Sequence, residues 1–346
     1  MEKIAVMTGG GDCPGLNAAI RAVVLTGLRY DHETLGIRNG WRGLIDGDVI
    51  ALDDSSVSGI ISWGGTILGT SRIDPMKNPG DLAKIKKVLR INKIGALVVI
   101  GGNGTLSAAY EVSEKGIPVI GIPKTIDNDI CGSDAAVGFD TAVSVVMEAI
   151  DRLRTTAESH HRIMVVEVMG RNAGWIGLMS GIAGGADMIL IPEIRLTIDE
   201  ISRDLEARYK EGNKFSIVVI AEGTNHKDIT ETEVPDCNRD ECGHEKFVGV
   251  GNQLGKELEH RLGVETRVTV LGHIQRGGTP TAYDRILATR FGISAVEQIL
   301  AGKIGCMMAL QGTRIDTVPL KNVASQIKLV DPGFYDHLTM IHNKKR

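Results

Sequence analysis

Short apolar runs alternate with amphipathic segments along most of the chain. Residues 4–7 and 96–100 are entirely apolar, and residues 163–168 and 215–221 are nearly so. Runs of this kind are typical of strands in a parallel sheet that is covered on both faces. The segments between them place apolar side chains at helical spacing, as residues 138–155 do. The pattern therefore predicts the α/β fold class.

The remaining elements follow from the same pattern. Further strands are predicted at residues 34–37, 118–122, 188–191, 265–270 and near 308, and further helices at residues 16–28, 82–91, 106–115, 198–211, 250–262, 284–300 and from about 173. Residues 223–246 are polar and charged with little periodicity, which predicts a surface insertion or lid. The last residues, 344–346 among them, are expected to form a solvated tail.

The composition narrows the class of protein. The chain has 346 residues, which suits two domains, and it combines 43 glycines with only 4% aromatic residues. This mixture favours an α/β enzyme with many tight strand-to-helix turns. A net charge of −4 without long runs of one sign argues against nucleic acid or a membrane surface as a partner.

The chain also carries no sign of export or membrane insertion. No apolar run approaches the roughly 20 residues that a membrane-spanning helix needs. The first three residues lead directly into a strand, so no signal peptide is expected. The five cysteines are scattered and odd in number, which suits reduced thiols. A cytoplasmic location is the simplest interpretation.

Glycine-rich turns follow two of the predicted strands. Residues 9–15 follow the strand at 4–7, and residues 101–105 follow the strand at 96–100. A turn of this kind exposes backbone N–H groups at a helix N-terminus, where an anion is stabilised. The first turn lacks the Gly-Lys-Ser/Thr of a Walker A loop, and Pro14 disrupts a dinucleotide fingerprint.

Residues 62–72 form a third glycine-rich segment, which ends in Arg72. The planar guanidinium group offers a fork of donors that suits a phosphate group. A solvent-facing arginine is the simpler interpretation of this segment taken alone.

The stretch at residues 121–129 brings two carboxylates, a hydroxyl and an ammonium group to the end of another strand. In an extended backbone, residues i and i+2 point to the same side, so Asp127 and Asp129 are expected to face one cavity. Two carboxylates that lie so near each other require a metal ion, or one of them acts as a base, or both. A polar turn that caps the next helix is the alternative. Open α/β sheets place their ligands at such strand ends.

A basic cluster of Arg267, His273 and Arg276 follows the strand at 265–270. A phosphate ester is the natural ligand for such a cluster, and a set of interface ion pairs is the alternative. In the polar insertion, Cys237, Cys242 and His244 lack a clear fourth ligand, so they do not make a convincing metal site.

These stretches, in this order, resemble the phosphofructokinase family. The matching segments are residues 10–19 (GGDCPGLNAA), 101–105 (GGNGT), 123–129 (PKTIDND), 167–171 (EVMGR) and 272–278 (GHIQRGG). The resemblance covers nearly the whole chain.

The resemblance implies two Rossmann-like three-layer α/β/α domains with mostly parallel sheets and an active site between them. Residues 1–138 plus about 275–326 are expected to form the phosphoryl-donor domain. Residues 139–274 plus about 327–346 are expected to form the sugar-phosphate domain.

The resemblance also implies roles for individual residues. Asp127 is expected to take the proton from the 1-hydroxyl of fructose 6-phosphate, with Arg72, Lys124, Thr125 and Arg171 as further catalytic residues. The implied donor-binding residues are Gly11, Arg72, Gly102, Asn103, Gly104 and Thr105, and the implied Mg²⁺ ligands are Asn103 and Asp129. The implied substrate-binding residues are Thr125, Asp127, Asp129, Arg162, Met169, Gly170, Arg171, Glu222, Arg267, His273 and Arg276.

Arg162 and Arg267 resemble arginines that reach in from a neighbouring subunit. The resemblance therefore implies a homo-oligomer, usually a tetramer, with active sites shared between subunits.

Two positions bear on the phosphoryl donor and point in different directions. Gly104 leaves room for the α-phosphate and nucleoside of ATP, whereas the family's pyrophosphate users typically carry an aspartate there. Lys124 instead resembles the pyrophosphate users. A blocked nucleotide pocket would exclude ATP outright, while an extra lysine would not, so ATP is the predicted donor and pyrophosphate the alternative.

Two other activities stay open. Asn103 stands where the family usually has an acidic residue, which leaves a weakly active regulatory paralogue possible. A kinase of another sugar or of a nucleoside is the second possibility, although the basic cluster would then lack a phosphate to bind.

Overall fold

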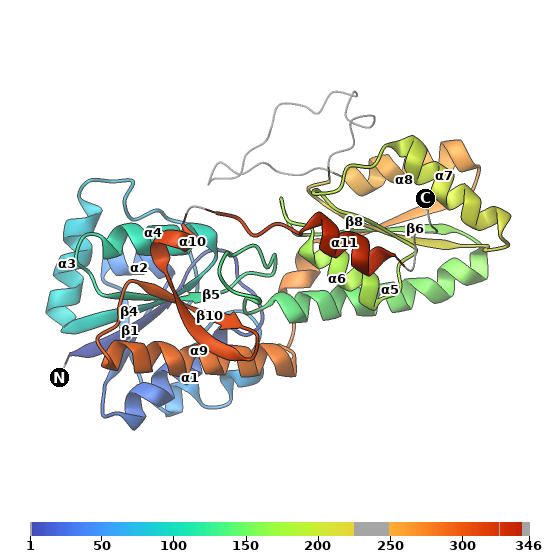
Figure 1. The fold of residues 1–346 in the computed structure, drawn as a ribbon. Helices are drawn as coiled ribbons and strands as arrows, with labels where there is room; N and C mark the ends of the chain where they lie inside the picture. The colour runs from blue at the N-terminus through green and yellow to red at the C-terminus, as the bar shows by residue number, and fades with distance from the viewer. Residues whose placement is uncertain (1, 225–248, 325, 341–346) are drawn as a thin grey trace. The chain divides into compact units, whose positions relative to one another are not determined.

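The computed structural model describes residues 2–224, 249–324 and 326–340. The chain divides into two compact units (Figure 1). Unit 1 consists of Met1–Thr141 and Arg276–Lys328, and unit 2 of Ala142–Gln275 and Leu329–Arg346. Each unit is built on a mainly parallel sheet with helices on both faces, which confirms the predicted α/β class.

Unit 1 contains a sheet with the strand order β11-β10-β5-β4-β1-β2-β3. Its strands are β1 (Lys3–Thr8), β2 (Thr34–Ile37), β3 (Val49–Leu52), β4 (Ile94–Gly101), β5 (Val119–Pro123), β10 (Cys306–Gln311) and β11 (Arg314–Pro319). The five central strands run parallel, and only the edge strands β3 and β11 are antiparallel to their neighbours. The carboxyl ends of β1, β4 and β5 therefore lie at one edge of the sheet.

The helices of unit 1 cover both faces of this sheet. They are α1 (Leu16–Arg29), α2 (Gly40–Asp46), α3 (Asp81–Asn92), α4 (Asn103–Ser113), α9 (Ala282–Leu300) and α10 (Leu320–Val323), with the 3₁₀ turns η1 (Ser55–Val57) and η2 (Ile60–Ser62). Helices α1 and α9 pack together on one face, and α2, α3, α4 and α10 cover the other (Figure 1). Helices α1 and α4, which follow the neighbouring strands β1 and β4, thus lie on opposite faces. The gap between these two strand ends is the topological switch point, where open α/β sheets bind ligands.

Unit 2 contains a smaller, fully parallel sheet with the order β7-β8-β6-β9. Its strands are β6 (Ile163–Val168), β7 (Met188–Leu190), β8 (Ser216–Ala221) and β9 (Thr266–Val270). Its helices are α5 (Phe139–His160, which begins in unit 1), α6 (Trp175–Ala183), α7 (Ile198–Lys210), α8 (Val250–Leu262) and α11 (Pro332–Thr339), and η3 (Gly272–Arg276) follows β9. Helices α7 and α8 bury their apolar side chains against β6 and β8.

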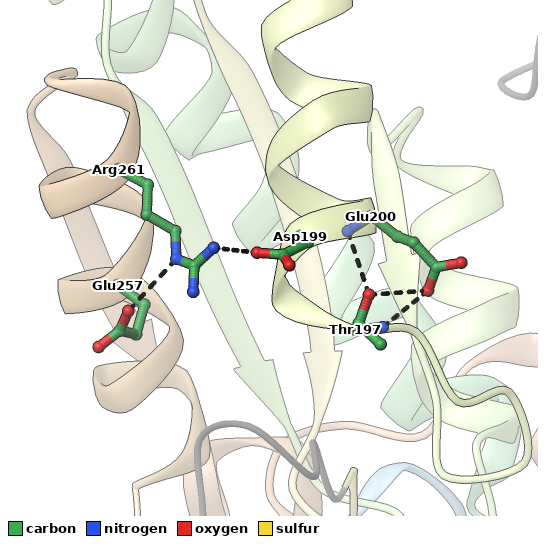
Figure 2. Close-up of polar contacts among 5 residues, drawn as sticks. All are labelled: Thr197, Asp199, Glu200, Glu257 and Arg261. Carbon is green, nitrogen blue, oxygen red and sulfur yellow. Dashed lines mark hydrogen bonds and ion pairs between the residues drawn. The ribbon is translucent and has the colours of Figure 1, made fainter.

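The start of α7 shows how the sequence fixes one helix boundary (Figure 2). The hydroxyl of Thr197 accepts a hydrogen bond from the backbone N–H of Glu200 at 3.2 Å, and the Glu200 carboxylate accepts one from the backbone N–H of Thr197 at 2.9 Å. This reciprocal capping box satisfies N–H groups that a helix start leaves without partners. Arg261 of α8 pairs with Asp199 in the first turn of α7 and with Glu257 of its own helix, so the two helices are also linked by charge.

Some elements were not predicted from the pattern. Helix α2, strand β3 and strand β11 were missed, as was helix α11, which Asp331 caps by accepting from the backbone N–H of Phe334 at 3.0 Å. Tyr335 of α11 is buried and donates to the carbonyl of Ile189 at 2.8 Å. Residues 344–346 of the predicted tail lie outside the described residues, as does the predicted insertion beyond Thr224, with Cys237, Cys242 and His244. Among the helices of the described residues, none is long and apolar enough to cross a membrane.

Candidate active site

The turns after β1 and β4 lie against each other at the switch point of unit 1. The backbone N–H of Gly9 donates to the carbonyl of Ile100 at 2.9 Å. A side chain on Gly9 would lie 2.6 Å from Thr105 Cγ2, and one on Gly101 would also meet Thr105. Glycine is therefore required at both positions by close packing, and Thr105 is the buried residue that fills the space between the two turns.

Lys124, at the end of β5, links this strand to the turn after β1. Its ammonium group donates to the carbonyl of Gly9 at 3.0 Å and to the carbonyl of Gly11. Only 2% of the residue is exposed, and this burial lowers the pKa of Lys124. The sequence predicted an ammonium beside the donor site, and the structure adds that main-chain oxygens of the glycine-rich turn hold it.

The segment that carries Arg72 is attached to the same turn. The hydroxyl of Thr70 donates to the carbonyl of Gly10 at 2.6 Å, and the backbone N–H of Gly10 donates to the carbonyl of Ser71 at 2.9 Å. Arg72 is the next residue, and its side chain is exposed. The backbone at Arg72 thus lies beside the glycine-rich turn, where the clamp hypothesis requires it.

Asn17, a residue that the sequence pattern did not single out, holds the other end of this segment. Its amide group donates to the carbonyls of Trp63 and Gly64, each at 3.2 Å, and its amide oxygen accepts from the backbone N–H of Ile67 at 2.8 Å. The residue is buried in the first turn of α1. An asparagine among apolar neighbours was the available signal, because a buried amide must find partners for all its polar groups.

Arg276 also contacts the glycine-rich turn. Its Nη1 donates to the carbonyl of Asp12 at 3.3 Å and would lie 2.8 Å from a side chain on Gly11. Arg276 therefore belongs to unit 1, beside the glycine-rich turn. Its role at the sugar phosphate stays a prediction.

Residues 127–129 do not have the extended backbone that was predicted. Asn128 has a φ of 51°, a left-handed conformation that turns the chain between the two carboxylates. Its side chain stabilises this turn, because its amide donates to the carbonyl of Asp134 at 3.3 Å and its oxygen accepts from the backbone N–H of Ala136 at 3.1 Å. The argument that Asp127 and Asp129 share one side of a strand was therefore wrong in its premise.

Asp127 is the most unusual group of the site. The residue is 5% exposed, and its backbone N–H donates to the hydroxyl of Thr125 at 3.1 Å. Its Oδ1 atom is buried and finds no hydrogen-bond partner within residues 2–224, 249–324 and 326–340. A buried carboxylate oxygen without a partner is costly, so such an atom is typically one that a ligand satisfies.

Asn103 and Asp129 are joined by a hydrogen bond between their side chains. The amide group of Asn103 donates to Oδ2 of Asp129 at 2.8 Å, while the amide oxygen of Asn103 is buried and unpaired within the described part of the chain. No group of three or more His, Cys, Asp or Glu side chains that could hold a metal occurs among the described residues. An amide oxygen and one carboxylate nevertheless suit Mg²⁺, which usually takes one or two protein oxygens and completes its octahedron with phosphates and water.

The two glycines at the start of α4 leave its N-terminus accessible. Gly102 precedes the helix in an extended conformation, and Gly104 is exposed in its first turn. A Cβ atom built at Gly104 would meet no heavy atom of the described residues within 4 Å. The space next to Gly104 is therefore open in the described structure.

In unit 2, the loop after β6 is shaped by strained backbone. Gly170 and Arg171 have φ values of 140° and 52°, and the backbone N–H of Arg171 donates to Oε1 of Glu222 at 3.1 Å. The backbone N–H of Met169 donates to Oε1 of Gln275 at 3.2 Å. Gln275 is fully buried and also donates to the carbonyl of Gly272 at 3.0 Å. It thereby ties this loop to η3, which carries the exposed His273.

Arg162, directly before β6, and Arg267, in the adjacent strand β9, share one carboxylate. Arg162 Nε donates to Oε2 of Glu265 at 2.6 Å, and Arg267 pairs with Oε1 of the same residue. The hydrogen bond from Arg162 is the main reason that the pKa of Glu265 is lowered. Both arginines are thus ion-paired within this chain, and their role in a neighbouring subunit stays a prediction.

The predicted residues consequently fall into two groups, one in each unit. Unit 1 holds Gly11, Arg72, Gly102, Asn103, Gly104, Thr105, Lys124, Thr125, Asp127, Asp129 and Arg276, and unit 2 holds Arg162, Met169, Gly170, Arg171, Glu222, Arg267 and His273.

Comparisons with known proteins agree with this fold. A family model described as phosphofructokinase matches residues 3–299. An ATP-dependent 6-phosphofructokinase of Mycobacterium bovis is 50% identical over 336 residues, which cover 96% of this chain and 98% of that protein. A pyrophosphate–fructose 6-phosphate 1-phosphotransferase of Streptomyces coelicolor is 49% identical over 338 residues, which cover 97% of this chain and 98% of that protein.

Among solved structures, the crystal structure of Pichia pastoris phosphofructokinase in the T-state matches with a TM-score of 0.84 at 32% identity, over 94% of this chain and 36% of that chain. Fold and relatives together define the chain as a phosphotransferase. It belongs to the phosphofructokinase family, as its sequence motifs predicted.

Proposed function

We propose that this enzyme phosphorylates the 1-hydroxyl of fructose 6-phosphate with ATP and Mg²⁺, producing fructose 1,6-bisphosphate and ADP. The curated relatives at about half identity are named for transfer to fructose 6-phosphate, whichever donor they use. The observation that carries the proposal is Asp127, a buried carboxylate whose Oδ1 lacks a partner in the described structure. Asp127 follows β5 in the same segment as Lys124, which contacts the glycine-rich turn.

In this proposal Asp127 acts as the general base. A carboxylate that accepts the hydroxyl proton makes the sugar oxygen a better nucleophile, and such a step contributes typically ~10²–10⁴-fold to a rate. The hydroxyl of Thr125 fixes the backbone at Asp127. Thr125 also binds the transferring phosphoryl group in this scheme.

The donor phosphates bind at the switch point of unit 1. The turn that contains Gly11, the start of α4 at Gly102 and Asn103, and the Arg72 guanidinium offer donors of the kind that stabilise phosphate oxygens. Mg²⁺, held by the amide oxygen of Asn103 and by Asp129, supplies further neutralisation of phosphate charge when bound. Phosphoryl transfer depends mainly on such positioning and neutralisation.

The acceptor binds to unit 2. Met169, Gly170, Arg171 and Glu222 of unit 2 line the sugar in this proposal. His273 of unit 2 binds its 6-phosphate, and Arg276, which belongs to unit 1, is proposed as a second ligand of that phosphate. The hydrogen bonds of Gln275 and Glu222 to the loop after β6 support a preformed binding surface. A preformed site lowers the entropy that substrate binding loses.

The donor is ATP because Gly104 leaves the space beside α4 open. Pyrophosphate is the second candidate, since Lys124 places an ammonium group at the turn and relatives with either donor are equally similar. Contacts of Lys124 with two main-chain carbonyls favour ATP, because they give this ammonium a structural role that does not depend on pyrophosphate.

A matrix of donors and acceptors tests the proposal. Purified enzyme is assayed with ATP or pyrophosphate against fructose 6-phosphate, other sugar phosphates, free sugars and nucleosides. We expect turnover with ATP, Mg²⁺ and fructose 6-phosphate, and loss of ATP use by at least ~10²-fold in Gly104→Asp through charge repulsion and bulk. Turnover with pyrophosphate alone would show that the donor was assigned wrongly.

Gly80→Asp is the matched control for this substitution. Gly80 lies at a helix start, as Gly104 does, because it is the N-cap residue of α3, and its φ is −85°. A Cβ atom added at Gly80 would meet no described heavy atom within 4 Å. It lies before α3 and is not part of the proposed site, so its variant should retain wild-type activity with ATP.

Asp127→Asn tests the base directly. The substitution keeps the size of the side chain and removes its negative charge, so kcat should fall by ~10³-fold while the thermal midpoint stays equal or rises. An Asp127→Asn enzyme as fast as wild type would contradict the proposed mechanism.

We further propose a homo-oligomer, most simply a tetramer, in which Arg162 and Arg267 reach the sugar phosphate of a neighbouring subunit. Arg267 is exposed on the edge strand β9, which supports this assignment.

A further inference from the structure

A short strap late in the chain pairs with the loop that carries Asp129. The strap consists of residues 326–328, the last part of unit 1. Ile327 forms an antiparallel bridge with Ile130, and the backbone N–H of Lys328 donates to the carbonyl of Asp129 at 2.9 Å. Nearly 200 residues of sequence separate the partners, yet the strap lies directly beside the proposed metal ligand.

The side chain of Lys328 extends this contact to the far side of the loop. Its ammonium donates to the carbonyls of Ser133 at 2.8 Å and Asp134 at 3.0 Å. The carbonyl of Asp134 also accepts from the amide of Asn128 at 3.3 Å. One residue therefore holds both ends of the loop from Asn128 to Asp134.

The loop needs such support. Asn128 is in a left-handed conformation, which an asparagine adopts more readily than most residues but only under local restraint. Asp127 and Asp129 flank it, and the buried carboxylate oxygen of Asp127 has no partner in the described structure. A site with a strained turn and neighbouring like charges relaxes unless its surroundings fix it.

Lys328 is also a cation placed among acidic groups. The groups of the loop that interact with it electrostatically are Asp134, Asp129 and Cys131. Removing the ammonium would therefore take one donor from each of two carbonyl oxygens, of which that of Asp134 would keep the Asn128 amide, and would leave the acidic charge of the loop uncompensated.

We propose that Lys328 is a positioning residue, which clamps the Asn128–Asp134 loop and so holds Asp127 and Asp129 in their reactive arrangement. The inference rests on the proposed function for the identity of the reaction. The clamp itself is a property of the loop that is measurable without turnover.

Three variants test the clamp. Lys328→Met removes the ammonium and keeps an apolar chain of similar length, and Lys328→Arg keeps a cation that can donate to both carbonyls. Lys321→Met is the matched control, because Lys321 is an exposed lysine of α10 a few residues earlier. Kinetics are compared under the donor and acceptor that wild type uses best.

We expect Lys328→Met to lower kcat by ~10–10²-fold, with KM for both substrates changed less than about twofold, because a displaced base slows chemistry more than it weakens binding. Lys328→Arg should recover most of the loss, and Lys321→Met should match wild type. Unchanged kcat in Lys328→Met, or a loss that arginine does not rescue, would overturn the inference.

Amide hydrogen exchange separates this inference from the proposed function. Peptides that cover residues 127–136 should exchange faster in Lys328→Met than in wild type or Lys321→Met, whatever substrate the enzyme uses. Equal exchange in all proteins would refute the clamp. If wild type failed to phosphorylate fructose 6-phosphate, the proposed function would fail while the exchange result still decided the role of Lys328.

Discussion

Two buried oxygen atoms in unit 1 belong to residues of the proposed site. Oδ1 of Asp127 and the amide oxygen of Asn103 both lack hydrogen-bond partners in the described part of the chain. Buried polar atoms without partners destabilise a fold by about 1–3 kcal/mol each. Their presence is understandable if the sugar hydroxyl and a hydrated Mg²⁺ ion satisfy them during the reaction.

Sequence motifs could predict these residues, but not their surroundings. The resemblance pointed to Asp127 and Asn103, whereas the contact between Asn103 and Asp129 depends on the side-by-side pairing of β4 and β5. The left-handed Asn128 was missed for a similar reason, since its restraints come from Asp134 and Ala136, farther along the loop. Long-range partners of this kind leave no periodic signal.

Asn103→Asp should increase the dependence of the enzyme on Mg²⁺. The Asn103 amide now donates to Asp129 at 2.8 Å, and an aspartate there would set two carboxylates against each other. Such a pair requires a cation or a proton. We expect a lower thermal midpoint than wild type without Mg²⁺ and a larger rise on its addition, measured by thermal shift, with a steeper Mg²⁺ requirement in kinetics. Identical Mg²⁺ titrations of both proteins would contradict this view of Asn103.

At the scale of elements, the starts of α5 and α9 cap each other. Asp284, in the first turn of α9, accepts from the backbone N–H groups of Gly138 at 2.9 Å and Thr141 at 2.8 Å, and from the Thr141 hydroxyl. The hydroxyl of Thr281 accepts from the backbone N–H of Asp284 at 3.3 Å and donates to Asp140 at 2.6 Å. These bonds secure the place where α5 leaves unit 1.

Asp284 should also make stability depend on pH. Burial raises the pKa of Asp284 from 3.8 to about 6, despite the donors around it. A group with a raised folded-state pKa adds stability that is complete below the unfolded value and is lost as the pH rises through the folded value. Lowering the pH from 7.5 to 5.5 should therefore add about 1 kcal/mol from this residue.

Urea denaturation of wild type and Asp284→Asn at both pH values measures this contribution. The variant cannot titrate at position 284, so its gain in unfolding free energy should be smaller than that of wild type by the stated amount. Asp54→Asn, which changes an exposed carboxylate, should keep the wild-type gain. Parallel pH responses of wild type and Asp284→Asn would show that Asp284 does not titrate in this range.

Elements with a continuous apolar run or regular helical spacing were predictable, and the glycine-punctuated helix α2 was not. Strand β6 and helix α8 have the predicted bounds for this reason, and the short strand β2 was also predicted with its bounds. Helix α2 was missed because it contains Gly40 and Gly43, which indicate a turn from sequence alone. A side chain at Gly43 would collide with the carbonyl of Arg38, so packing of the folded chain requires this glycine.

At the scale of the whole molecule, the chain builds each unit from separated segments. Unit 1 takes its first 141 residues and then residues 276–328, and the parallel pairing of β10 with β5 joins the two parts. Periodicity identifies β10 as a strand but carries no information on its neighbour. Only the family resemblance indicated that the chain returns to its first domain.

The proposed sharing of active sites between subunits leads to a test on the assembly itself. Asp127 belongs to unit 1, while Arg162 and Arg267 lie in unit 2 and pair with Glu265 in the isolated chain. If those arginines serve a neighbour's site, Asp127→Asn subunits and Arg162→Ser/Arg267→Ser subunits are each inactive for a different reason.

Dissociating and reassociating an equal mixture of the two variants should then restore about a quarter of wild-type activity. Half of the subunit pairs are hybrids, and each hybrid holds one intact site of two. Size-exclusion chromatography confirms reassembly. Wild type that is dissociated and reassociated in the same way measures the activity lost in the procedure. Recovery no greater than the sum of the two parent variants would show that each chain completes its own site, since the defects would then stay in separate sites however the subunits are combined.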